Sequence, residues 1–276
     1  MDVQTLRAEA FKALHERDGA FVIPNPWDAG SAKLLASLGF EALATTSAGL
    51  AFSLGRPDAE GALDLEQTLG NARAIVDATP LPVAADLENG FGDLPETCAE
   101  TIRQAAGVGL VGGSIEDASG QADAPIYDFG LSVERVRAAV QAARELPFPF
   151  TLCARAENLL HGRLDLDDTI RRLQLMPRLV PMCCMPRACA ASTRSVPSCR
   201  PWRPSRSTCW MGMAGVALSL NQLQDLGVKR ISVGSSLART ALGAFRRAAL
   251  EIRDEGTFDY GEQAMPFAEL NDLFRR

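Results

Sequence analysis

Short apolar segments alternate with amphipathic helical segments along most of this chain, and this alternation limits the folds that it can adopt. Each apolar segment is rich in β-branched or small residues and is followed by a stretch with helical periodicity. Repeats of this kind place parallel strands side by side and cover them with helices, which is an α/β fold. The sequence predicts six such strands, at residues 20–24, 41–46, 82–86, 111–116, 149–155 and 229–234.

One segment departs from this pattern. No acidic residue occurs between Asp168 and Asp225, although the chain carries 34 of them, and no glycine occurs from Leu175 to Met211. A disordered or basic insertion is one interpretation. The other is a shifted reading frame over about residues 174–210, because back-translation with G/C-rich codons, read in another frame, restores acids, glycines and two strand-like runs. The frameshift interpretation raises the number of predicted strands to eight.

Eight parallel strands with intervening helices make a (β/α)8 TIM barrel, and 276 residues is a suitable length for one. We expect a single barrel domain over residues 1–255 and a helical tail over residues 256–276. In the tail, Phe267, Leu270 and Phe274 share one helical face, which can pack on this barrel or on a partner subunit. Three barrel helices carry start signals, at Asp28, Pro95 and Ser132.

Three carboxylates follow two neighbouring predicted strands. Asp86 ends the segment 82–86, Glu88 lies two residues further on, and Glu116 ends the next segment. Residues two apart on a strand share a face, and the carboxyl ends of parallel strands meet at one rim of a barrel. Because converging carboxylates repel one another unless a cation lies between them, the sequence predicts a Mg²⁺ site made by Asp86, Glu88 and Glu116. Three solvated loop acids are the alternative.

Five motifs occur in the order typical of the isocitrate lyase/phosphoenolpyruvate mutase superfamily, which the chain resembles over roughly residues 15–173 and 211–255. The motifs are Asn25-Pro26-Trp27-Asp28, Thr45-Thr46-Ser47-Ala48-Gly49-Leu50, Leu54-Gly55-Arg56-Pro57-Asp58, Asp86-Leu87-Glu88 with Glu116, and Ala154-Arg155-Ala156-Glu157. The resemblance implies a TIM barrel with a Mg²⁺ cofactor. It also implies a homo-oligomer, a dimer or tetramer, whose C-terminal helices exchange between subunits.

The resemblance also implies roles for individual residues. Those implied to bind substrate are Trp27, Ser47, Ala48, Gly49 and Arg155. Those implied to be catalytic are Asp58, Glu116 and Arg155. A guanidinium at a strand end can ion-pair the nearby acids or bind a 2-oxo acid through two hydrogen bonds. Asp86 is implied to contact the metal directly, and Glu88 and Glu116 to hold its water shell; many members carry Asp where this chain has Glu88.

The loop after Glu116 departs from the superfamily. The lyases carry a Lys-Lys-Cys-Gly-His-type gating loop whose cysteine serves as acid, and the mutase carries a lysine in this loop. Here residues 117–127 contain no Cys, Lys or His. Cleavage of isocitrate or methylisocitrate by the usual route is therefore not expected, and the sequence does not name a proton donor. The loop is long and rich in small residues, so it can still act as a lid.

We therefore expect a Mg²⁺-dependent enzyme that acts on a small 2-oxo acid or dicarboxylate of the oxaloacetate class. It would cleave or form a C–C bond through an enolate stabilised by Mg²⁺ and Arg155. Three alternatives stay open: a non-catalytic 2-oxo acid binder, phosphonomutase-like P–C chemistry, and a different Mg²⁺-dependent aldolase barrel. The fold alone does not choose among them.

Composition limits the partners. The net charge of −6 and the lack of a basic tract with interleaved aromatic residues argue against nucleic acid. The sequence contains no apolar stretch of membrane-spanning length and no signal-peptide pattern at Met1, so a cytoplasmic protein is expected. Five of the seven cysteines lie between residues 183 and 209 in spacings that match no zinc site. Cys98 and Cys153 are expected to be buried thiols, and His15 a structural histidine.

Overall fold

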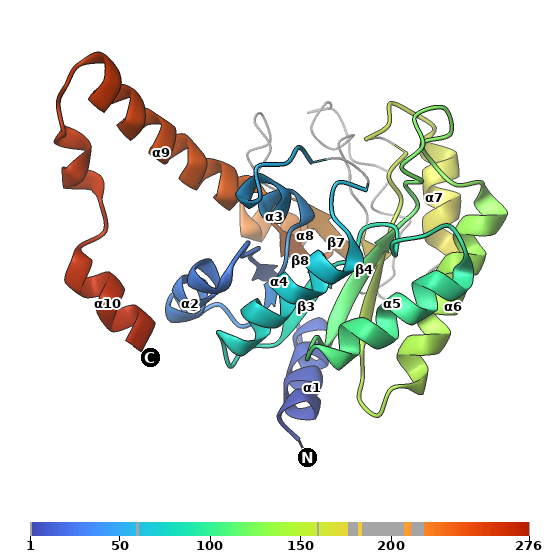
Figure 1. Cartoon of the computed structure of the whole chain (residues 1–276). Helices are drawn as coiled ribbons and strands as arrows, with labels where there is room; N and C mark the ends of the chain where they lie inside the picture. The colour runs from blue at the N-terminus through green and yellow to red at the C-terminus, as the bar shows by residue number, and fades with distance from the viewer. Residues whose placement is uncertain are drawn as a thin grey trace.

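The computed structural model describes residues 2–58, 61–158, 160–175, 182–183, 207–210 and 218–275. Its centre is a sheet of eight parallel strands in the order β1-β8-β7-β6-β5-β4-β3-β2 (Figure 1). β1 and β2 stand at the two ends of this order, and the backbone N–H of Ala44, in β2, donates to the carbonyl oxygen of Pro24, just after β1, at 3.1 Å. This bond joins the ends of the sheet, so the strands close into the predicted barrel.

The strands are β1 Phe21–Ile23, β2 Leu43–Ala44, β3 Val83–Asp86, β4 Gly112–Glu116, β5 Thr151–Arg155, β6 Met182–Cys183, β7 Ser207–Trp210 and β8 Val228–Ser232. The helices are α1 Val3–Glu16, α2 Ala29–Ser37, α3 Ser47–Ser53, α4 Leu65–Asp77, α5 Pro95–Gly107, α6 Phe129–Glu145, α7 Leu166–Leu175, α8 Leu220–Asp225, α9 Ser236–Asp254 and α10 Phe267–Arg275, with a 3₁₀ turn η2 at Asp259–Gln263. Each of the six strands predicted directly is present and is shorter than its predicted segment.

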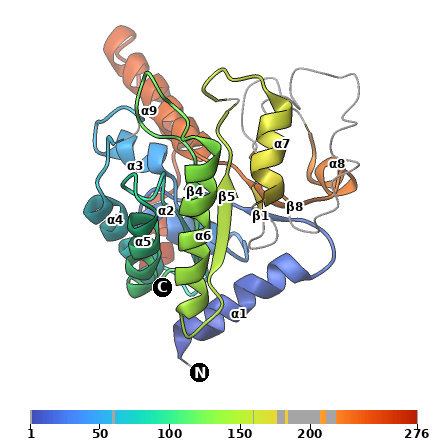
Figure 2. The ribbon, with the colours of Figure 1, turned by 90° about the vertical axis from the view of Figure 1, so that its right-hand side faces the viewer.

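The largest apolar cluster of the described residues lies between β3, β4 and β5 and the helices α4, α5 and α6. Figure 2 shows these three helices on one side of β4 and β5. Ile75, Ile102 and Leu152 are almost completely buried there. Burying one such side chain stabilises the folded state by about 1.5–3 kcal/mol. The strands that carry the candidate site residues therefore rest on a closely packed base, which keeps their ends in place.

Two of the three predicted helix starts are confirmed and one is wrong. Asp28 caps α2 by accepting the N–H of Ser31, and Pro95 is the first residue of α5. Ser132 does not begin a helix, because α6 starts at Phe129 and Asp128 caps it. Asp and Ser are equally good N-cap residues, and the one nearer the loop is used. Ser132 is instead buried within α6.

The chain after β8 leaves the barrel along α9, and the C-terminal tail then returns to it. α9 projects away from the strands, and α10 turns back beside α2 (Figure 1). Lys33, in α2, donates to the carbonyl oxygen of Phe274 at 3.0 Å. Phe245 and Phe267 are largely exposed. Exchange of this tail between subunits stays a prediction. In the part of the chain that the structure describes, no helix has the length and apolar character needed to cross a membrane.

Two smaller predictions can be compared with the structure. His15 is buried with its ring edge-on to those of Phe11 and Phe21, and the thiols of Cys98 and Cys153 are buried, as expected. β6 and β7 take the sixth and seventh places in the barrel. The frameshift interpretation concerns residues that lie largely outside the described ones, so it stays an interpretation.

Candidate active site

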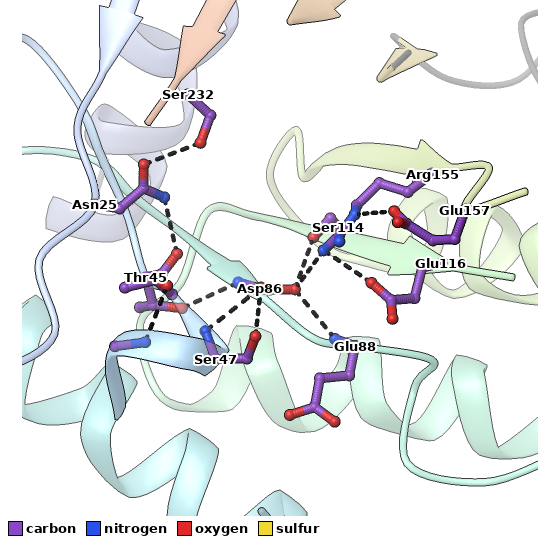
Figure 3. A network of polar contacts seen from close by, with 12 residues as sticks. Asn25, Thr45, Ser47, Asp86, Glu88, Ser114, Glu116, Arg155, Glu157 and Ser232 are labelled. Carbon is purple, nitrogen blue, oxygen red and sulfur yellow. Dashed lines mark hydrogen bonds and ion pairs between the residues drawn. The ribbon is translucent and has the colours of Figure 1, made fainter. Parts of the chain in front are cut away.

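Polar side chains from three adjacent strands meet at the carboxyl end of the barrel (Figure 3). Asp86 ends β3, Glu116 ends β4 and Arg155 ends β5, and the β4–β5 register pairs Glu116 directly with Arg155. Arg155 Nη1 lies 2.9 Å from Asp86 Oδ1 and 2.9 Å from Glu116 Oε2, and Arg155 Nε lies 2.8 Å from Glu157 Oε1. One guanidinium therefore pairs with three carboxylates, and it donates charge-assisted hydrogen bonds to Asp86 and Glu157.

Most of the other polar contacts converge on Asp86. Its Oδ2 accepts the hydroxyl of Ser47 at 2.9 Å and the backbone N–H of Ser47 at 3.4 Å. Its Oδ1 also accepts the hydroxyl of Ser114 and the backbone N–H of Glu88, each at 3.4 Å. The backbone N–H of Asp86 donates to the hydroxyl of Thr45 at 3.0 Å. Neighbouring elements on both sides of β3 thus set the orientation of this carboxylate.

The segment predicted to bind a substrate carboxylate forms the first turn of α3. Thr46 caps this helix by accepting the N–H of Gly49 at 3.2 Å, so that N–H is already paired. Ala48 is buried, and Ser47 directs both its hydroxyl and its N–H at Asp86. Ser47 is therefore the member of this segment that the structure joins to the acidic residues. Substrate binding by Ala48 and Gly49 stays a prediction.

Gly49 allows α3 to pack closely against Trp27. A Cβ at Gly49 would lie 2.6 Å from Thr46 Cγ2 and 2.9 Å from Trp27 Cβ. Gly49→Ala is therefore expected to lower the free energy of unfolding, measured by urea denaturation, by about 1–3 kcal/mol. Gly70→Ala is the matched control, because a Cβ there in α4 would meet no atom within 4 Å and should raise that free energy by about 1 kcal/mol. Equal effects of the two substitutions would contradict the packing argument.

Strand alternation predicted that Glu88 and Asp86 share a face, but Glu88 lies beyond the end of the strand. β3 ends at Asp86, and Glu88 has a φ of +46°, in the left-handed region. Its N–H faces Asp86, and its side chain leads away from the Asp86 carboxylate (Figure 3). Such a backbone costs about 1–3 kcal/mol and persists only where neighbouring groups hold it. Arg135, buried in α6, does so by donating to the loop carbonyl oxygens of Asn89, Gly92 and Asp93.

Burial dominates the electrostatics of Glu116. It raises the pKa of Glu116 well above its usual range; Arg155 lowers this pKa, and the charges of Glu157, Asp86 and Glu88 raise it further. Four carboxyl groups thus lie close enough to act on one another, against the one guanidinium of Arg155, so acidic groups outnumber the cation at the barrel mouth. That excess favours a cation, and carboxylate oxygens are ligands that Mg²⁺ prefers.

The residues present fit a divalent ion that keeps several water ligands. Within the described ranges, no group of three or more His, Cys, Asp or Glu side chains is placed to hold a metal ion by itself. Mg²⁺ is commonly bound through one or two carboxylates plus water. Asp86 would be the direct ligand, while Glu116 and Glu88 would hold the bound waters.

Hydrogen bonds fix both ends of the loop over residues 117–127. The N–H of Tyr127 donates to the carbonyl oxygen of Asp117 at 2.9 Å. Arg172, from α7, donates from Nη1 to Asp117 Oδ2 at 3.2 Å and to the carbonyl oxygen of Tyr127 at 2.9 Å. The other carboxylate oxygen of Asp117 accepts the backbone N–H of Glu157 at 2.7 Å. The base of the predicted lid is thereby joined to α7 and to the chain that follows Arg155.

Tyr127 links this loop to the segment after β3. Its hydroxyl donates to Asp93 Oδ1 at 2.6 Å and accepts from Asn89 Nδ2 at 3.2 Å. Burial, with the hydrogen bond to Asp93, raises the pKa of Tyr127 to about 12. Because the folded pKa lies above the usual value of 10.0, the stabilisation from this group is complete below about pH 10 and is lost as pH rises toward 12.

Ultraviolet titration tests this assignment. The chain has two tyrosines, so Tyr260→Phe leaves the absorbance of tyrosinate to Tyr127 alone. In that variant the absorbance is expected to rise near pH 12 while the protein is folded, and near pH 10 in denaturing urea, because unfolding exposes the phenol to water. A rise near pH 10 in the folded variant would contradict the buried hydrogen bond.

Three supporting residues were not singled out by the sequence as site residues. Thr45 and Ser114 contact Asp86 (Figure 3). Asn25, just after β1, links β2 and β8, the strands on either side of β1, because its side chain donates to the carbonyl oxygen of Thr45 at 3.0 Å and accepts the hydroxyl of Ser232 at 2.9 Å. Strand alternation could have found Ser114, since it lies two residues before Glu116 on β4.

Asp58 is exposed beyond the end of α3, next to residues 59–60, which fall outside the described ranges. Its catalytic role stays a prediction.

Comparison with known proteins identifies the family. The family model described as phosphoenolpyruvate phosphomutase matches residues 11–253. A crystal structure from Burkholderia cenocepacia, provisionally described as a lyase/mutase, is 55% identical and covers 100% of this chain and 98% of that chain, with a TM-score of 0.91. The 2-methylisocitrate lyase of Escherichia coli is 31% identical over 174 residues, which are 60% of this chain and 57% of that protein.

A more distant structure shares the fold. Oxaloacetate acetylhydrolase in complex with the product oxalate has a TM-score of 0.82 at 23% identity, covering 97% of this chain and 93% of that chain. The match of the family model over most of the chain agrees with the TIM barrel. The chain therefore belongs to the isocitrate lyase/phosphoenolpyruvate mutase superfamily and is an enzyme of its lyase or mutase type.

Proposed function

We propose that this enzyme uses Mg²⁺ to act on a small 2-oxo (di)carboxylic acid of the oxaloacetate class, cleaving or forming a C–C bond through an enolate. The observation that carries the proposal is Arg155 Nη1, held 2.9 Å from both Asp86 and Glu116 at the barrel mouth. A guanidinium beside an oxygen-lined cation site can bind the anionic acid and stabilise the enolate charge. The names of the relatives, 2-methylisocitrate lyase and oxaloacetate acetylhydrolase, support this substrate class.

Each residue has a defined part in this proposal. Bound at Asp86, Mg²⁺ would supply Lewis-acid chemistry to the 2-oxo group. Arg155 donates hydrogen bonds to the negative charge that develops as the C–C bond breaks. The hydroxyl of Ser47, which donates to Asp86 without substrate, would turn to donate to a substrate carboxylate, and the loop over residues 117–127 limits the access of water. Asp58 is retained as a catalytic candidate in the loop after α3.

Proton NMR of the purified protein tests the proposal. The substrate panel contains oxaloacetate, related 2-oxo and 2-hydroxy dicarboxylates and phosphonopyruvate, each with Mg²⁺ and with EDTA. The expected result is Mg²⁺-dependent conversion of a dicarboxylate above the spontaneous background. The identity of the products then shows which bond is broken. Conversion of phosphonopyruvate alone would instead establish P–C chemistry. Line broadening without conversion would favour a non-catalytic binder, the alternative that the absence of Cys, Lys and His from residues 117–127 supports.

Two further parts of the proposal concern the protein as a whole. We propose a homo-oligomer, a dimer or tetramer, and a cytoplasmic location. Size-exclusion chromatography with light scattering tests the first, and fractionation of cells that produce the full chain tests the second.

A further inference from the structure

Glu157 is a buried carboxylate that follows β5 and contacts Arg155. Its side chain is 2% exposed, and its Oε1 accepts from Arg155 Nε at 2.8 Å. Its Oε2 makes no hydrogen bond to any described residue. Burying a carboxylate is unfavourable, and a buried ion pair often contributes little to stability. Its position beside a site arginine therefore points to a function other than stabilising the fold.

The geometry of the guanidinium shows what Glu157 adds. Asp86 and Glu116 both contact the same nitrogen, Arg155 Nη1. These two contacts by themselves do not fix the orientation of the guanidinium plane. The contact from Glu157 to Nε supplies a second fixed point on the plane. Because the five donors of an arginine lie in one rigid plane, two fixed points determine where the remaining donors face.

Hydrogen bonds from neighbouring polar groups hold Glu157 and the residue after it in place. Its backbone N–H donates to Asp117 Oδ1 at 2.7 Å, and Asp117 Oδ2 accepts from Arg172 at 3.2 Å. Arg172 Nε also donates to Asp168 Oδ2 at 2.7 Å, and Asn158 Nδ2 donates to the same oxygen at 2.8 Å. Contacts from Asp117, just after β4, and from α7 thus hold the segment after β5, so the Glu157 carboxylate has little freedom to move.

We propose that Glu157 is a positioning residue for Arg155: its carboxylate sets the plane of the guanidinium whose Nη1 lies between Asp86 and Glu116. Its effect on turnover rests on the proposed function, whereas its effect on the arginine does not. When a group that stabilises developing charge is displaced by about 1 Å, the rate can fall about 10²-fold. Arg155 serves the transition state in the proposed reaction, so loss of its orientation is expected in kcat more than in KM.

Glu157→Gln is the principal variant, because it keeps the shape of the side chain and removes the charge. We expect kcat for the dicarboxylate that wild type converts to fall about 10- to 100-fold, with KM and Mg²⁺ affinity changed less than about threefold. Glu157→Ala, which also removes the acceptor for Nε, is expected to lower kcat further. Glu41→Gln is the matched control, since Glu41 pairs with Arg17 on the surface at 2.6 Å and should leave kcat unchanged.

A second readout needs no substrate. The Arg155 Nε–H resonance in a ¹⁵N–¹H correlation spectrum is identified by its loss in Arg155→Lys. We expect a slowly exchanging signal in wild type and in Glu41→Gln, and a displaced, faster-exchanging signal in Glu157→Gln. An unmoved signal overturns the proposal, and so does a displaced signal with kcat within twofold of wild type. If no compound in the panel is converted, the proposed function fails, and the displacement or constancy of this signal alone decides whether Glu157 positions Arg155.

Discussion

Asp86→Asn is expected to abolish Mg²⁺-dependent turnover, lowering kcat by at least about 10²-fold. Ser47 and Arg155 donate to the two oxygens of Asp86 at 2.9 Å each. An asparagine can present its one oxygen to only one of these donors, so its amide NH₂ would face the other. The substitution also removes the proposed direct ligand, so Mg²⁺ affinity measured by titration calorimetry without substrate should fall as well. The NMR assay with the full substrate panel measures kcat.

Asp77→Asn provides the matched control. Asp77 is exposed on α4, where it pairs with Arg73 at 3.0 Å, so its substitution should change neither kcat nor Mg²⁺ affinity. Circular dichroism of all three proteins separates loss of activity from loss of structure. If Asp86→Asn kept wild-type Mg²⁺ affinity while it stayed folded, the metal could not be bound by Asp86, and the proposed site would be wrong.

Arg172→Met should produce the largest loss of stability, lowering the free energy of unfolding by about 3–5 kcal/mol. Arg172 is buried and pairs with Asp117, which is 2% exposed, at 3.2 Å. Burial raises the pKa of Asp117 to about 6, although the N–H of Glu157 and Arg172 both lower it. Removal of the guanidinium would leave a buried carboxylate without its counter-charge and would remove one of the two side-chain hydrogen bonds to the carbonyl oxygen of Tyr127. Urea denaturation measures the change.

Arg103→Met tests whether burial is the cause. Arg103 also pairs with two carboxylates, Glu100 and Glu145, but all three side chains are about half exposed. This substitution should change the free energy of unfolding by less than about 0.5 kcal/mol. A similar loss in both variants would show that the buried Arg172 network contributes no more than a surface ion pair.

Local sequence patterns were sufficient to predict six of the eight strands, and the count of eight that indicated the barrel also needed the frameshift interpretation. Asp86, Glu116 and Arg155 each follow an apolar run, and parallel pairing brings the ends of such runs to one rim. Their meeting therefore depended only on alternation and strand order. Cap residues are less specific, which is why the start of α6 was placed at Ser132 when Asp128 caps it. A neighbouring residue of similar chemistry is enough to move a helix start by a turn.

Sequence alone thus determined the α/β barrel class, the family and the acidic strand ends, because periodicity and motif order are written in adjacent residues. Only the tertiary structure placed Arg155 between Asp86 and Glu116, turned Glu88 away from Asp86, and directed Ser47 to Asp86. Only the tertiary structure brought Arg172 to Asp117, 55 residues away in the chain. These contacts depend on strand register, a left-handed backbone and helix packing, which follow from interactions between distant segments and leave no local pattern.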